Sequence, residues 1–156
     1  MVIKSLRVIQ LDIYRRIILD SYHFRDEVSD MSSQSRSMSL GLEGKIVSRC
    51  YIDLDFGIQF FQGEYMATIT VGTRFSLTIN GDRFEIVPSD LTALCRAIHI
   101  VRKTIAQAVA RDDGTLEMVF TDGTELIVPP AAEHETWSFI SSDGMLLAPF
   151  PGEGLG

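Results

Sequence analysis

The chain has 156 residues, the usual size of one domain. Its hydrophobic fraction of 46% and its charged fraction of 22% are ordinary for a packed globular protein, which argues against disorder throughout the chain. The net charge of −7 is concentrated after residue 39, because residues 40–156 hold eight basic and sixteen acidic side chains. This acidic excess disfavours binding to nucleic acid and to anionic membranes, and it favours a basic partner protein or a cationic ligand.

Residues 1–38 are predicted to be an N-terminal extension or linker. One alternative is an amphipathic helix over residues 4–22, because apolar residues recur there at helical spacing: Leu6, Ile9, Ile13 and Ile17. Residues 29–39 contain six serines, a composition typical of a linker. Met31 and Met38 are both alternative start sites, so the other alternative is a poorly ordered tail or a gene-start artefact.

Residues 42–156 are predicted to form a single β-rich domain. Several runs alternate apolar and polar residues with a period of two, which is typical of half-buried antiparallel strands. The apolar positions of these runs are Cys50, Ile52, Leu54, Phe56, Ile58, Phe60, Phe75, Leu77, Ile79, Leu116, Met118 and Phe120. Dipeptides that favour tight hairpins separate the runs: Asn80-Gly81, Asp113-Gly114, Asp122-Gly123 and Asp143-Gly144, with Gln62-Gly63 as a weaker signal.

One segment has helical periodicity instead and predicts a helix over residues 89–102. Ser89 is the expected N-cap, Asp90 suits the positive helix start, and Arg102 suits the negative end. The apolar stripe expected to pack on the sheet is Leu91, Leu94, Cys95, Ile98 and Val101. The expected fold class is therefore α+β: mainly an antiparallel β-meander, or two small packed sheets, with one helix against them.

The two cysteines, Cys50 and Cys95, are too few for a disulfide scaffold. Both are predicted to face inward, and the favoured interpretation is two reduced cysteines in a cytoplasmic protein; a Cys50–Cys95 bridge is the alternative. No apolar run approaches the roughly 20 residues that span a bilayer. Charged residues interrupt the N-terminal apolar stretch, which argues against a signal peptide.

No catalytic, cofactor-binding or metal site is predicted. The three histidines are His23, His99 and His134, and His134 has no second histidine or cysteine at ligand spacing. His99 is expected on the solvated face of the helix. The paired carboxylates Asp53 and Asp55, and Asp112 and Asp113, are explained by strand ends and turns rather than by acid–base catalysis.

Three residues near the C-terminus are candidates for an interaction site: Trp137, Glu135 and His134. Trp137 is predicted on a strand, with Phe139 on the same face. It is interpreted either as a core aromatic or as an anchor in a partner interface, where tryptophan is enriched. His134 lies between Glu133 and Glu135 and is interpreted as a loop residue among charges.

The C-terminal part of the chain resembles a family of short uncharacterised bacterial proteins, a domain of unknown function found mainly in high-GC Gram-positive bacteria. The resemblance covers about residues 42–155. It is carried by Gly44 to Asp53 (GKIVSRCYID), Asp112 to Pro130 (DDGTLEMVFTDGTELIVPP), Glu135 to Phe139 (ETWSF), Ser142 to Leu147 (SDGMLL) and Pro151 to Gly154 (PGEG). These motifs are turns and core positions, so the resemblance implies a fold and no activity.

Two classes of function remain open. The favoured one is a non-enzymatic protein-interaction module with an acidic surface, of which an immunity-like inhibitor of a basic toxin is one example. Its partner is another protein or a second copy, which exposed strand edges would allow. The alternative is a small-ligand binder or enzyme, with a pocket between sheet and helix lined by Trp137 and Phe60.

Overall fold

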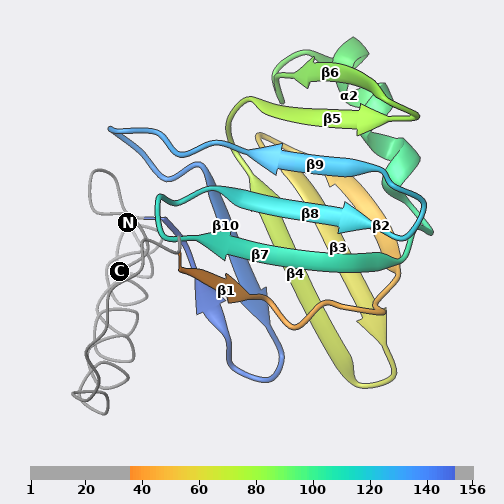
Figure 1. Ribbon diagram of the computed structural model, residues 1–156, viewed down its shortest axis with the longest axis vertical. Coiled ribbons are helices and arrows are strands. Elements are labelled where there is room, and N and C mark those ends of the chain that lie inside the picture. Colours follow the sequence, from red (N-terminus) through yellow and green to blue (C-terminus); the bar gives the residue numbers. More distant parts are fainter. Residues whose placement is uncertain (1–35, 150–156) are drawn as a thin grey trace, which may run out of the picture. The chain divides into compact units, whose positions relative to one another are not determined.

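The computed structural model describes residues 36–149. The predicted helix over residues 4–22 and His23 therefore lie outside the described residues. Eleven strands and one short helical segment make up the described part (Figure 1). In chain order they are β1 (Ser37–Ser39), β2 (Val47–Ile52), β3 (Phe56–Gln62), β4 (Tyr65–Val71), β5 (Phe75–Ile79), β6 (Asp82–Ile86), α2 (Leu91–Ala97), η1 (Ile98–Ile100), β7 (Ile105–Arg111), β8 (Leu116–Phe120), β9 (Glu125–Val128), β10 (Trp137–Ser141) and β11 (Leu146–Leu147).

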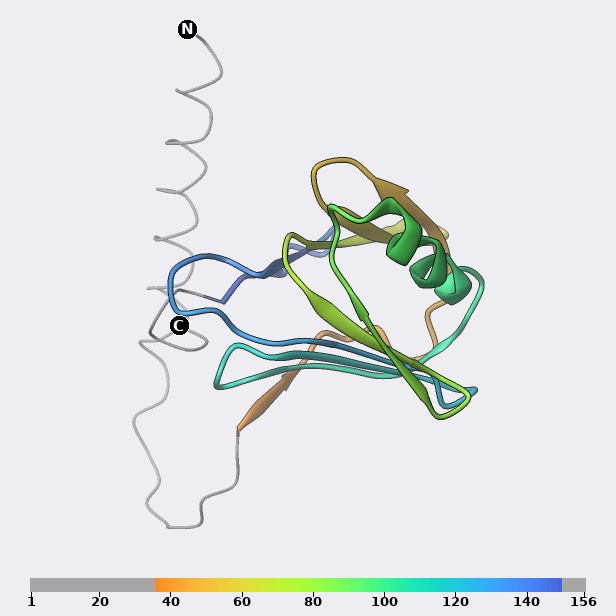
Figure 2. The same cartoon turned by 90° about the horizontal axis from the view of Figure 1, so that it is seen from above.

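The strands form two antiparallel sheets that share one core. The six-stranded sheet has the order β1-β7-β8-β9-β5-β6, and the five-stranded sheet has the order β11-β10-β4-β3-β2. Figure 2 shows the sheets as two layers, with α2 beside them. Buried side chains from both sheets and from α2 join a single apolar cluster. The α+β prediction, in its version with two small packed sheets and one helix, is confirmed.

Tight turns occur at the dipeptides that the sequence predicted. Asn80 and Gly81 have φ of 52° and 86° and form the two-residue loop between the paired residues Ile79 and Asp82, as the right-handed twist of a hairpin requires. The weaker Gln62-Gly63 signal also marks a two-residue loop, since Gln62 pairs with Tyr65. At three further turns an aspartate carboxylate accepts a hydrogen bond from the backbone N–H two residues on: Asp113 from Thr115, Asp122 from Thr124 and Asp143 from Met145.

The helix differs from its prediction. It runs over Leu91–Ala97 and continues as a single 3₁₀ turn instead of spanning residues 89–102. Asp90, not Ser89, is the N-cap: its carboxylate accepts hydrogen bonds from the backbone N–H groups of Thr92 and Ala93 at 3.0 and 3.2 Å. A carboxylate at the N-cap also interacts favourably with the positive end of the helix dipole.

The apolar stripe of the helix is also rotated from its predicted position. The buried residues are Leu94, Ala97 and Ile100, whereas Leu91 and Ile98 are 65% and 47% exposed. Cys95 is exposed as well, so the prediction that it faces inward is wrong. Ala97 is completely buried, so it lies on the face of the helix that packs on the core. His99 is exposed, as predicted.

The start of the domain also lies earlier than predicted. Ser37–Ser39 form β1, which pairs with β7 through Met38 and Ala110, so two residues assigned to the N-terminal extension belong to the six-stranded sheet. Within the described residues, no helix is long and apolar enough to cross a membrane.

Candidate functional site

The five-stranded sheet has one face against the core and one face toward solvent. Strand alternation separates the two sets, because successive side chains point to opposite sides. Residues such as Phe56, Ile69 and Phe139 are at most 1% exposed and fill the core. The solvent side, called the outer face below, is formed by the alternating set: Arg49, Tyr51, Gly57, Gln59, Phe61, Met66, Thr68, Thr70, Ser138, Ile140 and Leu146.

The outer face is almost free of charge. Arg49 is the only charged residue in the five strands of this sheet. Three large apolar side chains are nevertheless open to solvent: Phe61, Met66 and Ile140 are 44%, 48% and 48% exposed. A sheet face turned to water usually carries charged or strongly polar residues at these positions, so this surface differs from an ordinary solvated face.

Hydrogen bonds fix the one charge on this face. The strand register places Arg49, Gln59 and Thr68 in one row across β2, β3 and β4. The Arg49 Nε donates to Gln59 Oε1, and Gln59 Nε2 donates to Thr68 Oγ1 at 3.3 Å. The Arg49 guanidinium also lies 5.5 Å from the centre of the Phe61 ring, within the range of a cation–π interaction. The arginine is therefore held flat along the sheet.

Tyr51 and Gly57 form a second ordered pair on this face. They are cross-strand neighbours, and the Tyr51 ring covers the glycine so closely that a Cβ on Gly57 would lie 2.0 Å from ring atoms. The glycine is buried by this ring. An aromatic side chain that covers a glycine in the neighbouring strand protects the backbone that lacks a side chain.

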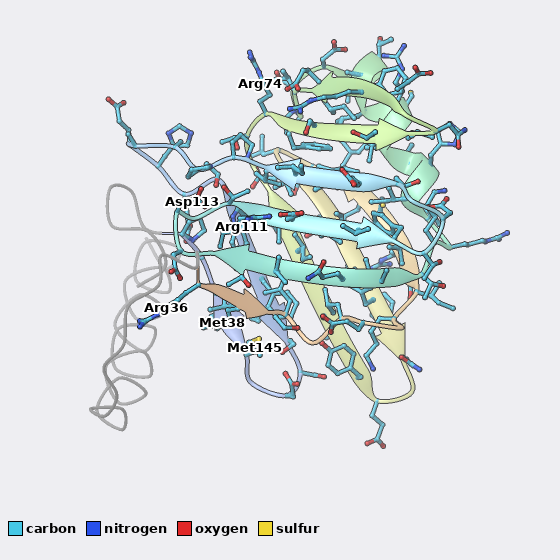
Figure 3. All side chains as sticks on the ribbon, viewed as in Figure 1. Arg36, Met38, Arg74, Arg111, Asp113 and Met145 are labelled. Atoms are coloured by element: carbon cyan, nitrogen blue, oxygen red, sulfur yellow. The ribbon has the colours of Figure 1, made fainter. Side chains whose placement is uncertain are left out.

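The outer side of the six-stranded sheet has a different chemistry. Its strands carry six charged residues: Asp82, Arg83, Glu85, Arg111, Glu117 and Glu125. Arg83 pairs with Glu85 at 3.1 Å, and Arg111, labelled in Figure 3, pairs with Glu117. The first pair lies within β6 and the second joins β7 to β8. Charged side chains of this kind are typical of a surface that stays in water.

The strand edges offer little room for another strand. The edge strands β1 and β11 have three and two residues, and the edge strand β6 carries three charges. At the edge strand β2, the register shifts between Val47 and Arg49, and the N–H and C=O of Val47 bond to Lys103 and Arg102. Short, charged or bulged edges are the usual protection against edge-to-edge pairing.

The structure separates the three predicted interaction residues. Trp137 is 2% exposed, and its indole N–H donates to the Gly114 carbonyl at 2.8 Å, so it occupies the core, which was one of its two interpretations. Phe60, the other proposed pocket residue, is completely buried. Glu135 and His134 are exposed in the loop before β10, where partial burial raises the pKa of Glu135.

The other side chains considered as catalytic or metal-binding candidates do not lie together in one site. Among residues 36–149, no three histidine, cysteine, aspartate or glutamate side chains are grouped as a metal site would need. Cys50 and Cys95 are both free, and burial raises the pKa of the Cys50 thiol to about 12, which suppresses its reactive thiolate form. Asp112 accepts a hydrogen bond from the Arg36 N–H at 3.0 Å and so ties the start of β1 to the β7–β8 turn.

Sequence reasoning did not identify the outer face. Its residues come from five strands whose pairing is not apparent from the sequence. The signal that was present is the absence of charge: residues 56–62 and 65–71 contain no charged side chain.

A family of unknown function (DUF6188) matches residues 38–156. The match confirms the resemblance to an uncharacterised domain family and begins four residues before the expected start at residue 42. No curated protein and no solved structure matches the chain.

Proposed function

The chain belongs to DUF6188, a family of unknown function, and we propose from its geometry that it is a non-enzymatic protein-interaction module whose outer face binds another protein. One observation carries this proposal: a sheet face with a single charge that exposes an aromatic and two large aliphatic side chains. Interface centres are depleted in charge and enriched in aromatic residues, methionine and arginine.

The free energy that could be gained by burying the exposed side chains agrees with an interface of weak to moderate affinity. Full burial of Phe61, Met66 or Ile140 would contribute roughly 2 kcal/mol each, and about half of that remains to be gained because each is about half exposed. Arg49 and Tyr51 belong to the residue types that dominate interface energies. Both are held in place by their neighbours, so little side-chain entropy is lost when a partner binds.

The loops at the strand ends carry part of the acidic charge that the sequence predicted for this domain. Glu133 and Glu135 precede β10, and Asp53 and Asp55 lie between β2 and β3. An acidic margin beside an apolar centre attracts a basic partner and slows encounters with acidic proteins. An immunity-like inhibitor of a basic toxin is one function that fits this charge pattern.

We also propose a source and a location for the protein. The bacterial, high-GC Gram-positive source rests on the sequence resemblance. A cytoplasmic location is supported by the two free thiols at Cys50 and Cys95, since reduced cysteines are typical of that compartment.

Affinity capture with matched variants tests the proposal. The full chain, Ile140→Lys and Gln107→Lys would each be immobilised and exposed to extract from the native cells, with proteins and small molecules identified by mass spectrometry. Ile140 lies on the outer face, and Gln107 is an exposed residue of β7, so both variants add one positive charge on different sheets. We expect proteins that are retained by the wild type and Gln107→Lys and lost by Ile140→Lys. Equal capture by all three chains, or capture of metabolites alone, would contradict the proposal.

A further inference from the structure

We infer that the outer face accepts an amphipathic segment of a partner protein, which lies along the strands with a Lys/Arg-rich end over the loops at residues 53–55 and 133–135. This inference rests on the proposed function and adds the chemistry and the direction of the partner.

The two ends of the outer face differ in charge. At the end where β4 finishes, the loops carry four carboxylates, called the acidic end below: Asp53, Asp55, Glu133 and Glu135. Both loops lie beside Gly72. Its N–H donates to the Thr136 carbonyl at 3.0 Å, and a Cβ added to it would lie 3.1 Å from the side-chain carboxylate of Asp55. Arg74 follows β4, but Figure 3 shows its side chain pointing away from the strands.

The opposite end is closer to neutral. Its two carboxylates are Glu64, between β3 and β4, and Asp143, between β10 and β11. A hydrogen bond from Ser141 lowers the pKa of Asp143, and the positive charge of Lys45 contributes in the same direction. The Lys45 Nζ lies 4.4 Å from the centre of the Tyr65 ring, at the start of β4. This lysine offsets part of the acidic charge, so a basic segment is drawn mainly to the acidic end.

A second copy of the chain fits this surface poorly. Two faces related by a two-fold axis parallel to the strands would bring their acidic ends together. A two-fold axis across the strands would instead place β2 against β2, and with it Arg49 against Arg49, because Arg49 lies in the middle row of the face. Both closed arrangements oppose like charges, whereas a basic partner has no such cost.

The dimensions of the face set the length of the segment. Strands β3 and β4 have seven residues each, which corresponds to about 23 Å at roughly 3.3 Å per residue. A helix covers that distance with about 15 residues at 1.5 Å per residue. Its apolar stripe would contact Phe61, Met66 and Ile140, and its basic end would reach the acidic end.

Two synthetic helical peptides of about 15 residues provide the test. Both carry the same apolar stripe, and one has three lysines at one end where the other has three glutamates. Each would be titrated into the ¹⁵N-labelled full chain at low and high salt, with a spin label at either end of the peptide. We expect the lysine peptide to shift outer-face amides and to bind about tenfold more tightly than the glutamate peptide, with a difference that salt reduces.

The spin label reports the direction. A label at the lysine end is expected to broaden the amide signals of residues 53–55 and 133–135, and a label at the other end those of Glu64 and Asp143. Ile140→Lys should abolish the shifts and Gln107→Lys should preserve them. Equal binding of the two peptides, the reverse orientation, or no binding would overturn the inference and leave the proposed function to the capture experiment. Shifts confined to the six-stranded sheet would count against both. If the amide signals of the outer face shift with the concentration of the chain when no peptide is present, the face binds a second copy, and this would overturn the inference.

Discussion

Trp137 joins the two sheets of the domain. It begins β10 in the five-stranded sheet, and its indole N–H bonds to the Gly114 carbonyl in the turn between β7 and β8 of the six-stranded sheet. Gly114 is itself enclosed, since a Cβ there would lie 3.1 Å from Pro149 and 3.3 Å from Pro130. The sequence predicted that Trp137 shares a strand face with Phe139, and a core aromatic was one of its two interpretations. The hydrogen bond across the layers could not be predicted, because it depends on how the sheets pack.

We predict that Trp137→Phe lowers the free energy of unfolding by about 1–3 kcal/mol, because the Gly114 carbonyl then loses its buried donor. The smaller ring adds a cavity cost in the same direction. Urea unfolding followed by circular dichroism measures the change. A loss below about 0.5 kcal/mol would show that water replaces the indole N–H without cost.

Asp122 is predicted to make stability depend on pH in the acid range. The hydrogen bond from Lys103, followed by one from the Thr124 N–H, lowers the pKa of Asp122 from 3.8 to about 2. A lowered pKa in the folded state stabilises the protein above the ordinary value, and this contribution is lost as the pH falls from about 4 to about 2. The effect is small because Asp122 is 47% exposed.

Asp122→Asn removes this contribution. The stability of the wild type should therefore fall more steeply between pH 4 and pH 2 than that of the variant, as measured by urea unfolding at each pH. Parallel pH curves for the two proteins would show that the Lys103–Asp122 pair does not persist in solution.

The short helix shows how packing overrides local pattern. The five-residue stripe predicted from periodicity is divided: Leu94 is buried, while Leu91 and Ile98 face water. The helix is only seven residues long, and Ala97, which the predicted stripe did not include, is completely buried. A pattern over so few turns does not contain that information.

Helix capping gives a matched pair of variants. Asp90→Ala should cost about 1 kcal/mol, because it removes the acceptor of two backbone N–H groups. Ser89→Ala alters the neighbouring residue, which is exposed, and should change stability by less than about 0.5 kcal/mol. Thermal unfolding of both variants checks this. A larger effect of Ser89→Ala than of Asp90→Ala would show that Ser89 is the N-cap, as the sequence predicted.

The sequence analysis named no alternating run at β4 or β7, and both strands have weak apolar contrast. In β4, the core residues Ala67, Ile69 and Val71 alternate with Met66, Thr68 and Thr70, so the solvent side lacks the charges that usually mark it. In β7, alanines occupy several positions, and the register shifts between Ile105 and Gln107, which breaks the period of two. Where contrast was strong, as at Leu116, Met118 and Phe120, the predicted burial is confirmed.

The Tyr51–Gly57 pair within strands β2 and β3 provides a coupling test. Gly57→Ala should displace the Tyr51 ring, since the new Cβ would lie 2.0 Å from it, at a cost on the order of 1 kcal/mol. In a Tyr51→Ser background the same alanine meets no ring and should cost less. A double-mutant cycle by urea unfolding measures this coupling. Additive effects would show that the ring does not cover the glycine.

At the scale of the whole molecule, the sequence predicted an acidic β-rich domain but not the outer face, which is the surface proposed to bind a partner. The loop residues Glu135 and His134 were identified because they are consecutive in the chain. Phe61, Met66 and Ile140 become neighbours only when β3, β4 and β10 pair. Surfaces that depend on strand order are not encoded in local pattern, so this part of the candidate site required the structure.

The most direct test of the account is the dissociation constant of a captured partner protein for three chains, measured by isothermal titration calorimetry. Ile140→Lys places a charge in the exposed apolar part of the outer face, while Gln107→Lys places the same charge on the other sheet. We predict that affinity falls at least about tenfold for Ile140→Lys and stays within about twofold of the wild type for Gln107→Lys. Equal affinities of all three chains, with the fold intact by circular dichroism, would contradict the assignment of the outer face as the binding surface.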